Sequence, residues 1–83
     1  MKNIFWFILI LYELINKLKW HNEYDFNKVI IWYISRGAPE GKDYIKGNEI
    51  KRVGKKFLET ANKYIPYHRI LKIEYEGKII FRK

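Results

Sequence analysis

The densest group of side chains able to do chemistry lies in residues 65–70, which read Ile-Pro-Tyr-His-Arg-Ile. His68 can hydrogen-bond a phosphate or transfer a proton near neutral pH, and Arg69 can hold two phosphate oxygens with its planar guanidinium. Pro66 fixes the backbone just before them. The pattern predicts a site that faces an anion. An equally supported alternative is a structural pair, with His68 bonded to the backbone and Arg69 bridged to a carboxylate such as Asp25.

Arg36 and Gly37 form a second candidate, because they follow a predicted strand and open a loop that contains glycine and proline. Sites are commonly built at strand ends, and glycine lets a ligand approach the backbone closely. We predict that Arg36 and His68 face one pocket. Spacing alone favours an ordinary turn glycine beside a solvated arginine, and the loop lacks the spacings of a Walker A or dinucleotide-binding motif.

Several kinds of site are excluded or weakly supported by the residue types present. The chain has no cysteine, which excludes disulfides, thiolate zinc sites, thiol nucleophiles and iron–sulfur clusters. His21 and Asp25 have a helix-like spacing but no further ligand nearby, so we predict no metal and no cofactor. Ser35 and Thr60 are the only serine and threonine, and neither lies in a triad-like setting. We therefore predict no catalytic residue and favour a function that is not enzymatic.

The charge balance predicts a polyanionic partner. Seventeen lysines and arginines against nine acidic residues give a net charge of +8, which favours nucleic acid over a membrane surface. Genome composition or a hot habitat would produce the same excess of lysine. The predicted nucleic-acid surface is the basic cluster Lys51, Arg52, Lys55 and Lys56, which could alternatively be a solvated face. Trp20 and Tyr67 are candidates for stacking on bases, although an aromatic residue at a helix exit is more often part of the core.

The hydrophobic pattern predicts the elements that must position these residues. Leucine and isoleucine at positions 11, 14, 15 and 18 recur with a helical period, and β-branched and aromatic runs predict strands. The predicted elements are a helix over residues 3–19, strands over residues 28–35, 44–46, 56–60, 71–75 and 78–82, and a brief helical turn from Asn48 to Val53 that Gly54 ends. The expected fold is α+β, with one N-terminal helix packed on a mostly antiparallel sheet of four or five strands and one short extra helical turn.

Residues 1–11 are predicted to be an apolar extension that continues into the first helix, and residues 12–83 to be a single domain. The apolar run is shorter than the roughly 20 residues of a membrane span. The sequence leaves open what this apolar segment is. It could be a buried extension, a contact with a second copy or a membrane, or residues added by a misassigned start codon. The absence of cysteine favours a cytoplasmic protein, and we do not expect a membrane partner.

The order of these motifs resembles a known family. The chain is similar to small archaeal proteins described as the RNA cyclic-group-end-recognition domain. The similarity lies above all in residues 65–70. It also includes the motif Tyr33-x-x-Arg36-Gly37 and Trp20 after a Leu-x-x-Leu-x-Trp-like helix end. The resemblance implies an RNA-binding module that recognises 2′,3′-cyclic phosphate or similarly processed ends. It also implies an RNA-processing enzyme as a further partner.

Carried onto this chain, the resemblance assigns phosphate contacts to Arg36, His68 and Arg69. Gly37 and Pro66 would shape the backbone around them. Two features depart from the family pattern: Ser35 stands where an acidic residue is common, and the segment before Tyr12 has no counterpart.

The main hypothesis is a non-enzymatic domain that binds RNA ends through an Arg/His phosphate site and a basic surface. A second hypothesis, from another class, is a phosphoesterase or RNase-like enzyme with His68 as the general acid or base. A third is a structural adaptor domain with no nucleic-acid role.

Overall fold

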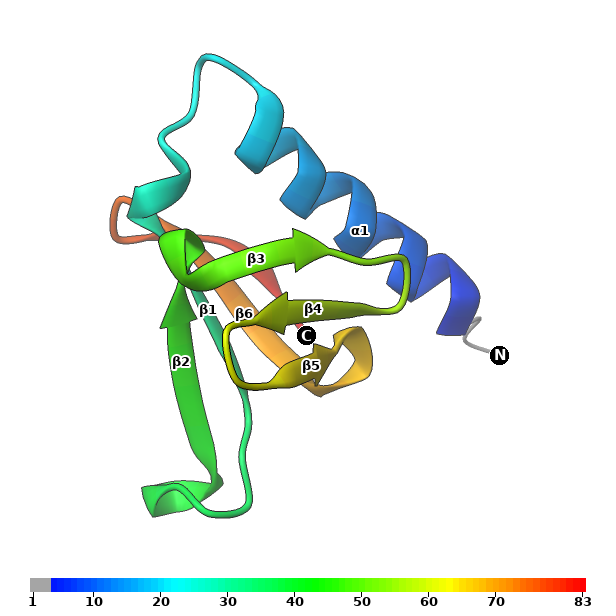
Figure 1. Cartoon of the computed structure of the whole chain (residues 1–83), viewed down its shortest axis with the longest axis vertical. Helices are drawn as coiled ribbons and strands as arrows, with labels where there is room; N and C mark the ends of the chain where they lie inside the picture. The colour runs from blue at the N-terminus through cyan, green and yellow to red at the C-terminus, as the bar shows by residue number, and fades with distance from the viewer. Residues whose placement is uncertain (1–3) are drawn as a thin grey trace.

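The computed structural model describes residues 4–83, which form one long helix, seven strands and four short 3₁₀ turns (Figure 1). The helix is α1 (Ile4–Trp20). The strands are β1 (Val29–Ile34), β2 (Lys42–Lys46), β3 (Ile50–Val53), β4 (Phe57–Thr60), β5 (Tyr64–Pro66), β6 (Ile70–Tyr75) and β7 (Lys78–Arg82). The 3₁₀ turns are η1 (Phe26–Lys28), η2 (Pro39–Gly41), η3 (Gly47–Glu49) and η4 (Tyr67–Arg69).

Four strands form an antiparallel sheet in the order β2–β1–β6–β7. Side chains alternate between the two faces of a strand, so β1 buries Ile31 and Tyr33 on one face and carries Trp32 on the other. Ile31 pairs with Ile45 of β2 and Ile73 of β6, which extends the buried face across the sheet. The apolar run of β1 therefore places it at the centre of the sheet.

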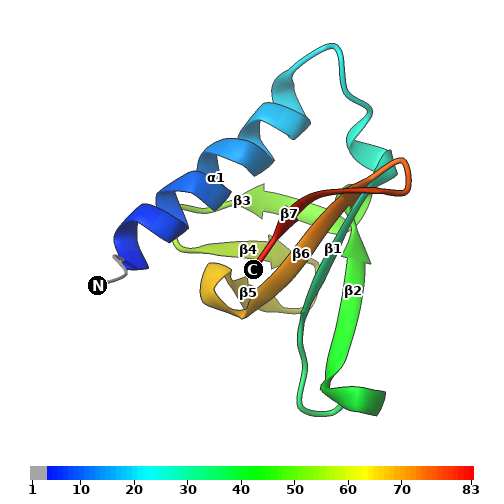
Figure 2. The same ribbon diagram turned by 180° about the vertical axis from the view of Figure 1, so that it is seen from behind.

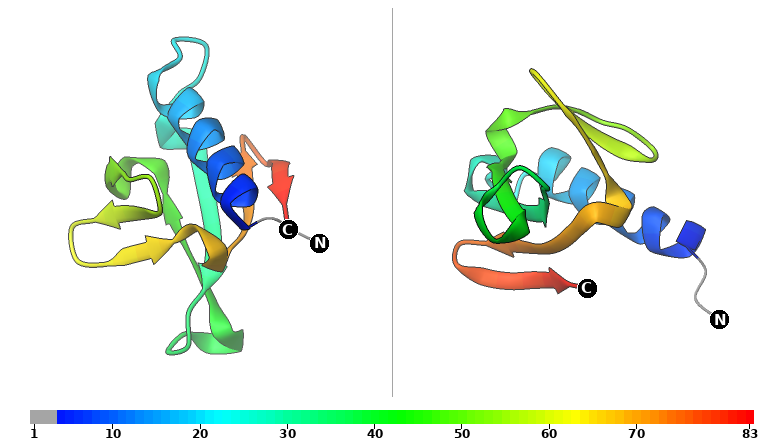
Figure 3. Two further views of the ribbon diagram at one scale, coloured as in Figure 1. Left: turned by 90° about the vertical axis from the view of Figure 1, so that its right-hand side faces the viewer. Right: turned by 90° about the horizontal axis from the view of Figure 1, so that it is seen from below.

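The three-stranded sheet β3–β4–β5 and helix α1 lie on the buried face of the four-stranded sheet (Figures 1 and 3). Leu58 of β4 and Ile65 of β5 are buried in the core that these layers share. Figure 2 shows the opposite face of the four-stranded sheet, which no element of residues 4–83 covers. The molecule therefore has one packed side and one open sheet face.

Helix α1 packs through the residues that its periodicity predicts. Leu11, Ile15 and Leu18 are buried in the core, and Phe7 meets Phe81 of β7 with ring centroids 5.8 Å apart. Lysines in the last turn complement the helix dipole. Within residues 4–83, no helix is both long and apolar enough to cross a membrane.

The α+β class, the N-terminal helix and the antiparallel strands are confirmed, and the strands are divided between two sheets. Asn3, the predicted first residue of the helix, lies outside the described residues. The predicted helical turn over residues 48–53 is wrong in its extent. Only η3 is helical, and residues 50–53 form β3, because buried Ile50 pairs with Thr60 of β4. The division into residues 1–11 and 12–83 stays a prediction.

Candidate anion-binding site

A pocket of about 250 Å³ lies where the end of β1 meets β5 and the η4 turn. Its lining comes from two segments that are distant in the sequence, one on each sheet. The lining residues are Tyr33, Ile34, Ser35, Arg36, Lys63, Tyr64, Ile65, Pro66 and Arg69. Three of them, Arg36, Lys63 and Arg69, carry a positive charge at neutral pH.

Strand pairing brings Arg36 and Arg69 to the same pocket. Tyr33 near the end of β1 pairs with Ile70 at the start of β6, so the residues just beyond each of these positions meet. Arg36 follows β1 in a loop that begins with a hydrogen bond from the Ser35 N–H to the Gly41 carbonyl, 2.9 Å long. Arg69 is the last residue of η4, directly before β6. The pairing of β1 with β6 thus explains how two arginines 33 positions apart line one site.

Within residues 4–83, neither arginine forms an ion pair with a carboxylate. The ion pairs among residues 4–83 are His21–Glu23, Lys28–Glu76 and Lys72–Glu74, and none includes a residue of the pocket. The Asp25 side chain instead accepts a hydrogen bond from the Asn27 N–H, 3.0 Å long, at the start of η1. The structural alternative pairs Arg69 with Asp25 or a similar carboxylate, and no such ion pair is present among residues 4–83. Guanidinium groups without a carboxylate partner can bind an external anion.

Lys63 is a third cation of the pocket, and no pattern in the sequence singles it out. Its ammonium Nζ donates a hydrogen bond to the Tyr33 hydroxyl, 2.9 Å away, and lies 5.5 Å from the centroid of that ring. This hydrogen bond, above all, raises the pKa of Lys63 from its usual value. Lys63 therefore stays charged at neutral pH, and β1 holds its ammonium group beside the pocket.

The turn that carries Lys63 is built by the only threonine of the chain. The Thr60 hydroxyl accepts hydrogen bonds from the N–H groups of Asn62 and Lys63, at 3.4 and 3.2 Å. The Thr60 N–H donates to the Lys63 carbonyl, 2.9 Å away. Thr60 thus has a structural role in this turn.

An exposed pair of aromatic rings borders the pocket. Tyr64 lines it and is 62% exposed, and its ring stacks on Phe57 of β4 with centroids 5.1 Å apart and an angle of 19°. A nucleobase can stack on such a ring whatever its sequence. In the sequence, the only signal for this exposed pair is the alternation of exposed and buried residues along β4 and β5. The pairing of the two strands then decides that the rings of Phe57 and Tyr64 meet.

His68 is exposed in η4 and is not among the residues that line the pocket, so the structure joins Arg36 with Arg69 rather than with His68. Its backbone carbonyl accepts a hydrogen bond from the Lys83 ammonium. His21, the other histidine, lies in the loop after α1, with its Nδ1 3.3 Å from Oε1 of Glu23. In the views of Figures 1 and 3 this loop lies apart from η4. The structure therefore does not bring the two histidines together for acid–base chemistry.

The remaining predicted site residues are distributed over the surface and the core. Gly37 is exposed and is not part of the pocket lining. The basic cluster of Lys51, Arg52, Lys55 and Lys56 is exposed on β3 and the turn after it, and its last two members border a depression beside α1. Trp20 is 73% exposed, with the Lys19 ammonium 5.2 Å from its ring centroid. Within residues 4–83, no three His, Asp or Glu side chains gather where they could hold a metal ion.

Tyr67 is not available for the stacking role predicted for it. The side chain is completely buried, and its hydroxyl donates a hydrogen bond to the Gly54 carbonyl. The η4 turn aims Tyr67 into the core while His68 and Arg69 stay at the surface. Tyr67 therefore anchors the backbone of the site, and its ring is not exposed for stacking on a base.

Replacing Tyr67 with phenylalanine should lower the free energy of unfolding by about 1–3 kcal/mol, because the Gly54 carbonyl loses its buried donor. In a domain of this size, each kcal/mol corresponds to about 4–8 °C in Tm, which thermal unfolding followed by circular dichroism would measure. Tyr64→Phe is the matched control, since Tyr64 is largely exposed. Equal losses of Tm in the two variants would contradict the anchoring role of Tyr67.

The wild type and Tyr67→Phe should also differ in how their stability changes at high pH. Burial raises the pKa of the Tyr67 hydroxyl above its ordinary value of 10.0. The unfolded chain therefore loses this proton first, so the stability that the hydroxyl contributes is complete below pH 10 and is lost as the pH rises towards the pKa of the folded state. The difference in unfolding free energy between the wild type and Tyr67→Phe should narrow above pH 10.

Comparison with known proteins places the chain beside a family of archaeal proteins. Residues 10–83 match the sequence profile of the MJ1316 RNA cyclic group end recognition domain. A UPF0248 protein of Archaeoglobus fulgidus is 39% identical over 69 residues, which cover 82% of this chain and 97% of that protein. The UPF0248 protein MJ1316 of Methanocaldococcus jannaschii is 38% identical over 81 residues, which cover 92% and 96%. No solved structure matches the chain at a comparable level of significance.

Proposed function

Since the chain belongs to the family of the MJ1316 RNA cyclic group end recognition domain, we propose that its pocket binds the terminal phosphate of processed RNA, with a 2′,3′-cyclic phosphate as the ligand. The observation that carries this proposal is the gathering of Arg36, Lys63 and Arg69 around one pocket, without a carboxylate partner among the described residues. A pocket whose lining has three cations and no carboxylate is suited to a phosphate group.

Each part of the pocket has a distinct role in this proposal. The two guanidinium groups hold phosphate oxygens through paired hydrogen bonds, which a lysine cannot reproduce. Lys63 adds a point charge whose position the Tyr33 hydroxyl fixes. The exposed ring of Tyr64 offers a surface on which the last base can stack, next to the phosphate.

The basic cluster supplies a second, less specific contribution. Its four exposed side chains attract the RNA backbone whatever the end carries. In this proposal, the cluster raises the affinity for all RNA and the pocket discriminates between ends. We also propose that the protein acts in the cytoplasm, beside an RNA-processing enzyme that makes or consumes such ends.

A comparison of RNA termini tests the proposal. The same single-stranded oligonucleotide would carry a 2′,3′-cyclic phosphate, a 3′-phosphate or a 3′-hydroxyl, and its affinity would be measured by fluorescence anisotropy at two salt concentrations. We expect the cyclic end to bind at least about tenfold more tightly than the hydroxyl end, since one charge-assisted hydrogen bond contributes about 1.5–3 kcal/mol. Both affinities should fall with salt, because the basic cluster contributes to each.

Equal affinities for the three ends would refute end recognition. Equal affinities for the two phosphorylated ends, both above the hydroxyl end, would make the ligand a terminal phosphate in general. The same samples, analysed for opening of the cyclic phosphate over many turnovers, would detect the enzymatic alternative.

A further inference from the structure

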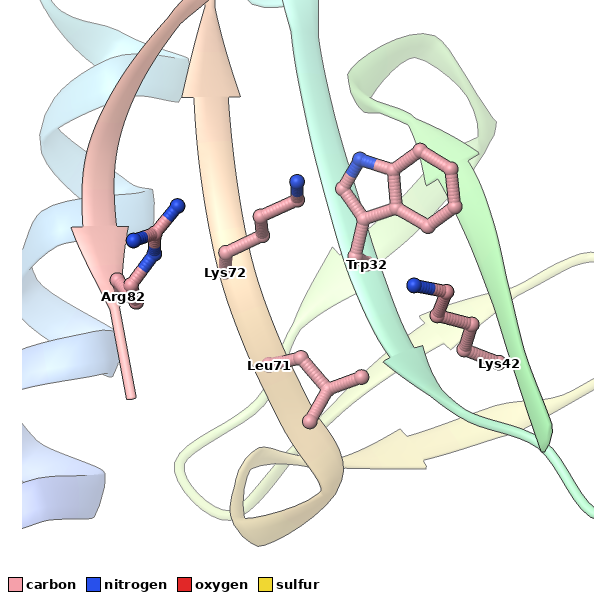
Figure 4. A pocket seen from close by; sticks show the side chains of 5 residues that line it. All are labelled: Trp32, Lys42, Leu71, Lys72 and Arg82. Carbon is pink, nitrogen blue, oxygen red and sulfur yellow. The ribbon is translucent and has the colours of Figure 1, made fainter. Parts of the chain in front are cut away.

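The open face of the four-stranded sheet carries a second group of aromatic and cationic side chains. Figure 4 shows Trp32, Lys42, Leu71, Lys72 and Arg82 on one side of the sheet, with the three-stranded sheet behind it. They line a pocket of about 250 Å³ that is separate from the anion-binding pocket. The buried layers lie on the other face, so nothing in residues 4–83 covers this group (Figure 2).

Strand register places four side chains in one row across the sheet. Trp32 pairs with Tyr44 of β2 on one side and with Lys72 of β6 on the other, and Lys72 pairs with Arg82 of β7. Directly paired residues project from the same face of an antiparallel sheet. The row therefore runs from two aromatic rings on β2 and β1 to two cations on β6 and β7.

The two rings form a platform that cations surround. The ring centroids of Trp32 and Tyr44 are 5.0 Å apart, and Tyr44 is 45% exposed. The Lys72 and Lys42 ammonium groups lie 5.4 and 6.0 Å from the Trp32 ring centroid. The indole N–H of Trp32 is buried without a hydrogen-bond partner among the described residues, which is uncommon for a structural tryptophan.

The charge of this face is positive. Glu74 is ion-paired with Lys72, with 3.3 Å between Nζ and Oε2. Within residues 4–83, Lys42 and Arg82 form no ion pair, so their charges are not neutralised. An aromatic platform bordered by cations is complementary to a strand in which flat bases alternate with phosphates.

We infer that the open sheet face binds the unpaired bases and the backbone of single-stranded RNA, independently of the terminal-phosphate pocket. A base stacks on Trp32 and Tyr44, and the neighbouring phosphates lie against Lys42 and Arg82. The strand must be single, because the bases of a duplex are already stacked on one another and present only their edges. The choice of RNA over DNA rests on the proposed function, whereas the stacking surface does not.

A circular RNA tests this surface, because it has no terminal phosphate for the other pocket. The probe is a fluorescent circle of about 12 uridines, within the range of about 4–16 nucleotides that a single-strand-binding domain covers. The full chain should bind the circle. Trp32→Leu and Tyr44→Leu, which retain apolar cover but not an aromatic face, should each weaken binding by about 5-fold to 100-fold.

Charge variants provide matched controls. Lys42→Ala and Arg82→Ala should weaken binding to the circle and reduce its salt dependence, by about 0.7 in the log–log slope for each phosphate that is no longer neutralised. Lys17→Ala removes the same charge from the exposed side of α1 and should leave binding to the circle nearly unchanged. Thermal unfolding would show that each variant is folded, and Tyr44→Leu keeps the test decisive if Trp32→Leu is destabilised.

Three results would overturn the inference: no binding of the circle, equal binding by the folded wild type and both leucine variants, or equal affinity for the circle and a duplex of the same length. Failure of the proposed function is a separate outcome. It would appear as a loss of discrimination between linear RNA ends, which the circular probe does not report.

Discussion

Arg69→Ala should reduce the affinity for RNA that ends in a 2′,3′-cyclic phosphate by about 10- to 100-fold, and the affinity for the same RNA with a 3′-hydroxyl much less. The reason is that Arg69 lines the pocket and has no carboxylate partner in the described chain, so its charge-assisted hydrogen bonds are available for the terminal phosphate. Such bonds contribute about 1.5–3 kcal/mol each. Arg36→Ala should behave in the same way, since β1–β6 pairing brings both residues to the pocket.

The lysine substitution separates geometry from charge. Arg69→Lys keeps the positive charge but loses the planar fork, so we expect part of the discrimination between ends to disappear while the overall affinity for RNA is kept. Arg52→Ala is the matched control, because it removes an exposed guanidinium from the basic cluster on β3. It should weaken binding to both ends by the same factor.

The ratio between the two affinities is the decisive quantity. If Arg69→Ala lowers both affinities by the same factor as Arg52→Ala does, Arg69 is one more backbone contact and the pocket is not an end-recognition site. His68→Ala should change this ratio less than Arg69→Ala, since the His68 side chain does not line the pocket. A larger effect of His68→Ala would restore the predicted role of that imidazole.

The sequence predicted much of the architecture because most of the strands have a clear local signal. The alternation in β6, the Glu76-Gly77 turn and the apolar run of β1 depend only on neighbouring residues, and Gly77 indeed has a positive φ of 82°. β3 was missed because an Asn followed by a short charged stretch has the local signature of a helical turn. Its strand character comes from pairing with β4, which is a tertiary contact.

The candidate site shows the same division between local and tertiary information. Arg36 and Arg69 could be singled out from their positions at predicted strand ends, whereas their common pocket depends on which strands pair. Lys63 has no distinguishing neighbours in the sequence, and only the fold places it against the Tyr33 hydroxyl. Tyr67 was misjudged because residue type does not reveal which way a 3₁₀ turn directs a side chain.

A small substitution should lower the stability of the fold most at Gly47, in the connection between the two sheets. Gly47 opens η3, between β2 of one sheet and β3 of the other. A Cβ at this position would lie 1.9 Å from the backbone carbonyl oxygen of Phe26 in η1, which is far inside van der Waals contact. Because the obstacle is backbone, η1 and η3 would have to separate.

Gly47→Ala should therefore lower the free energy of unfolding by about 3 kcal/mol or more, which corresponds to a fall of roughly 12–24 °C in Tm for a domain of this size. It should also weaken binding of the cyclic end. The pocket takes Arg36 from the loop after β1 and Lys63 from the turn before β5, so moving one sheet relative to the other separates its cations.

Gly37→Ala is the matched control and a test in its own right. A Cβ at Gly37 would meet no atom within 4 Å, and this residue does not have a positive φ, so its Tm should stay close to that of the wild type. If Gly37 admits a ligand close to the backbone, as the sequence predicts, Gly37→Ala should weaken RNA-end binding without loss of stability. Unchanged Tm in both variants would mean that η1 and η3 can separate at little cost, and that the two halves of the pocket are not held in place by their junction.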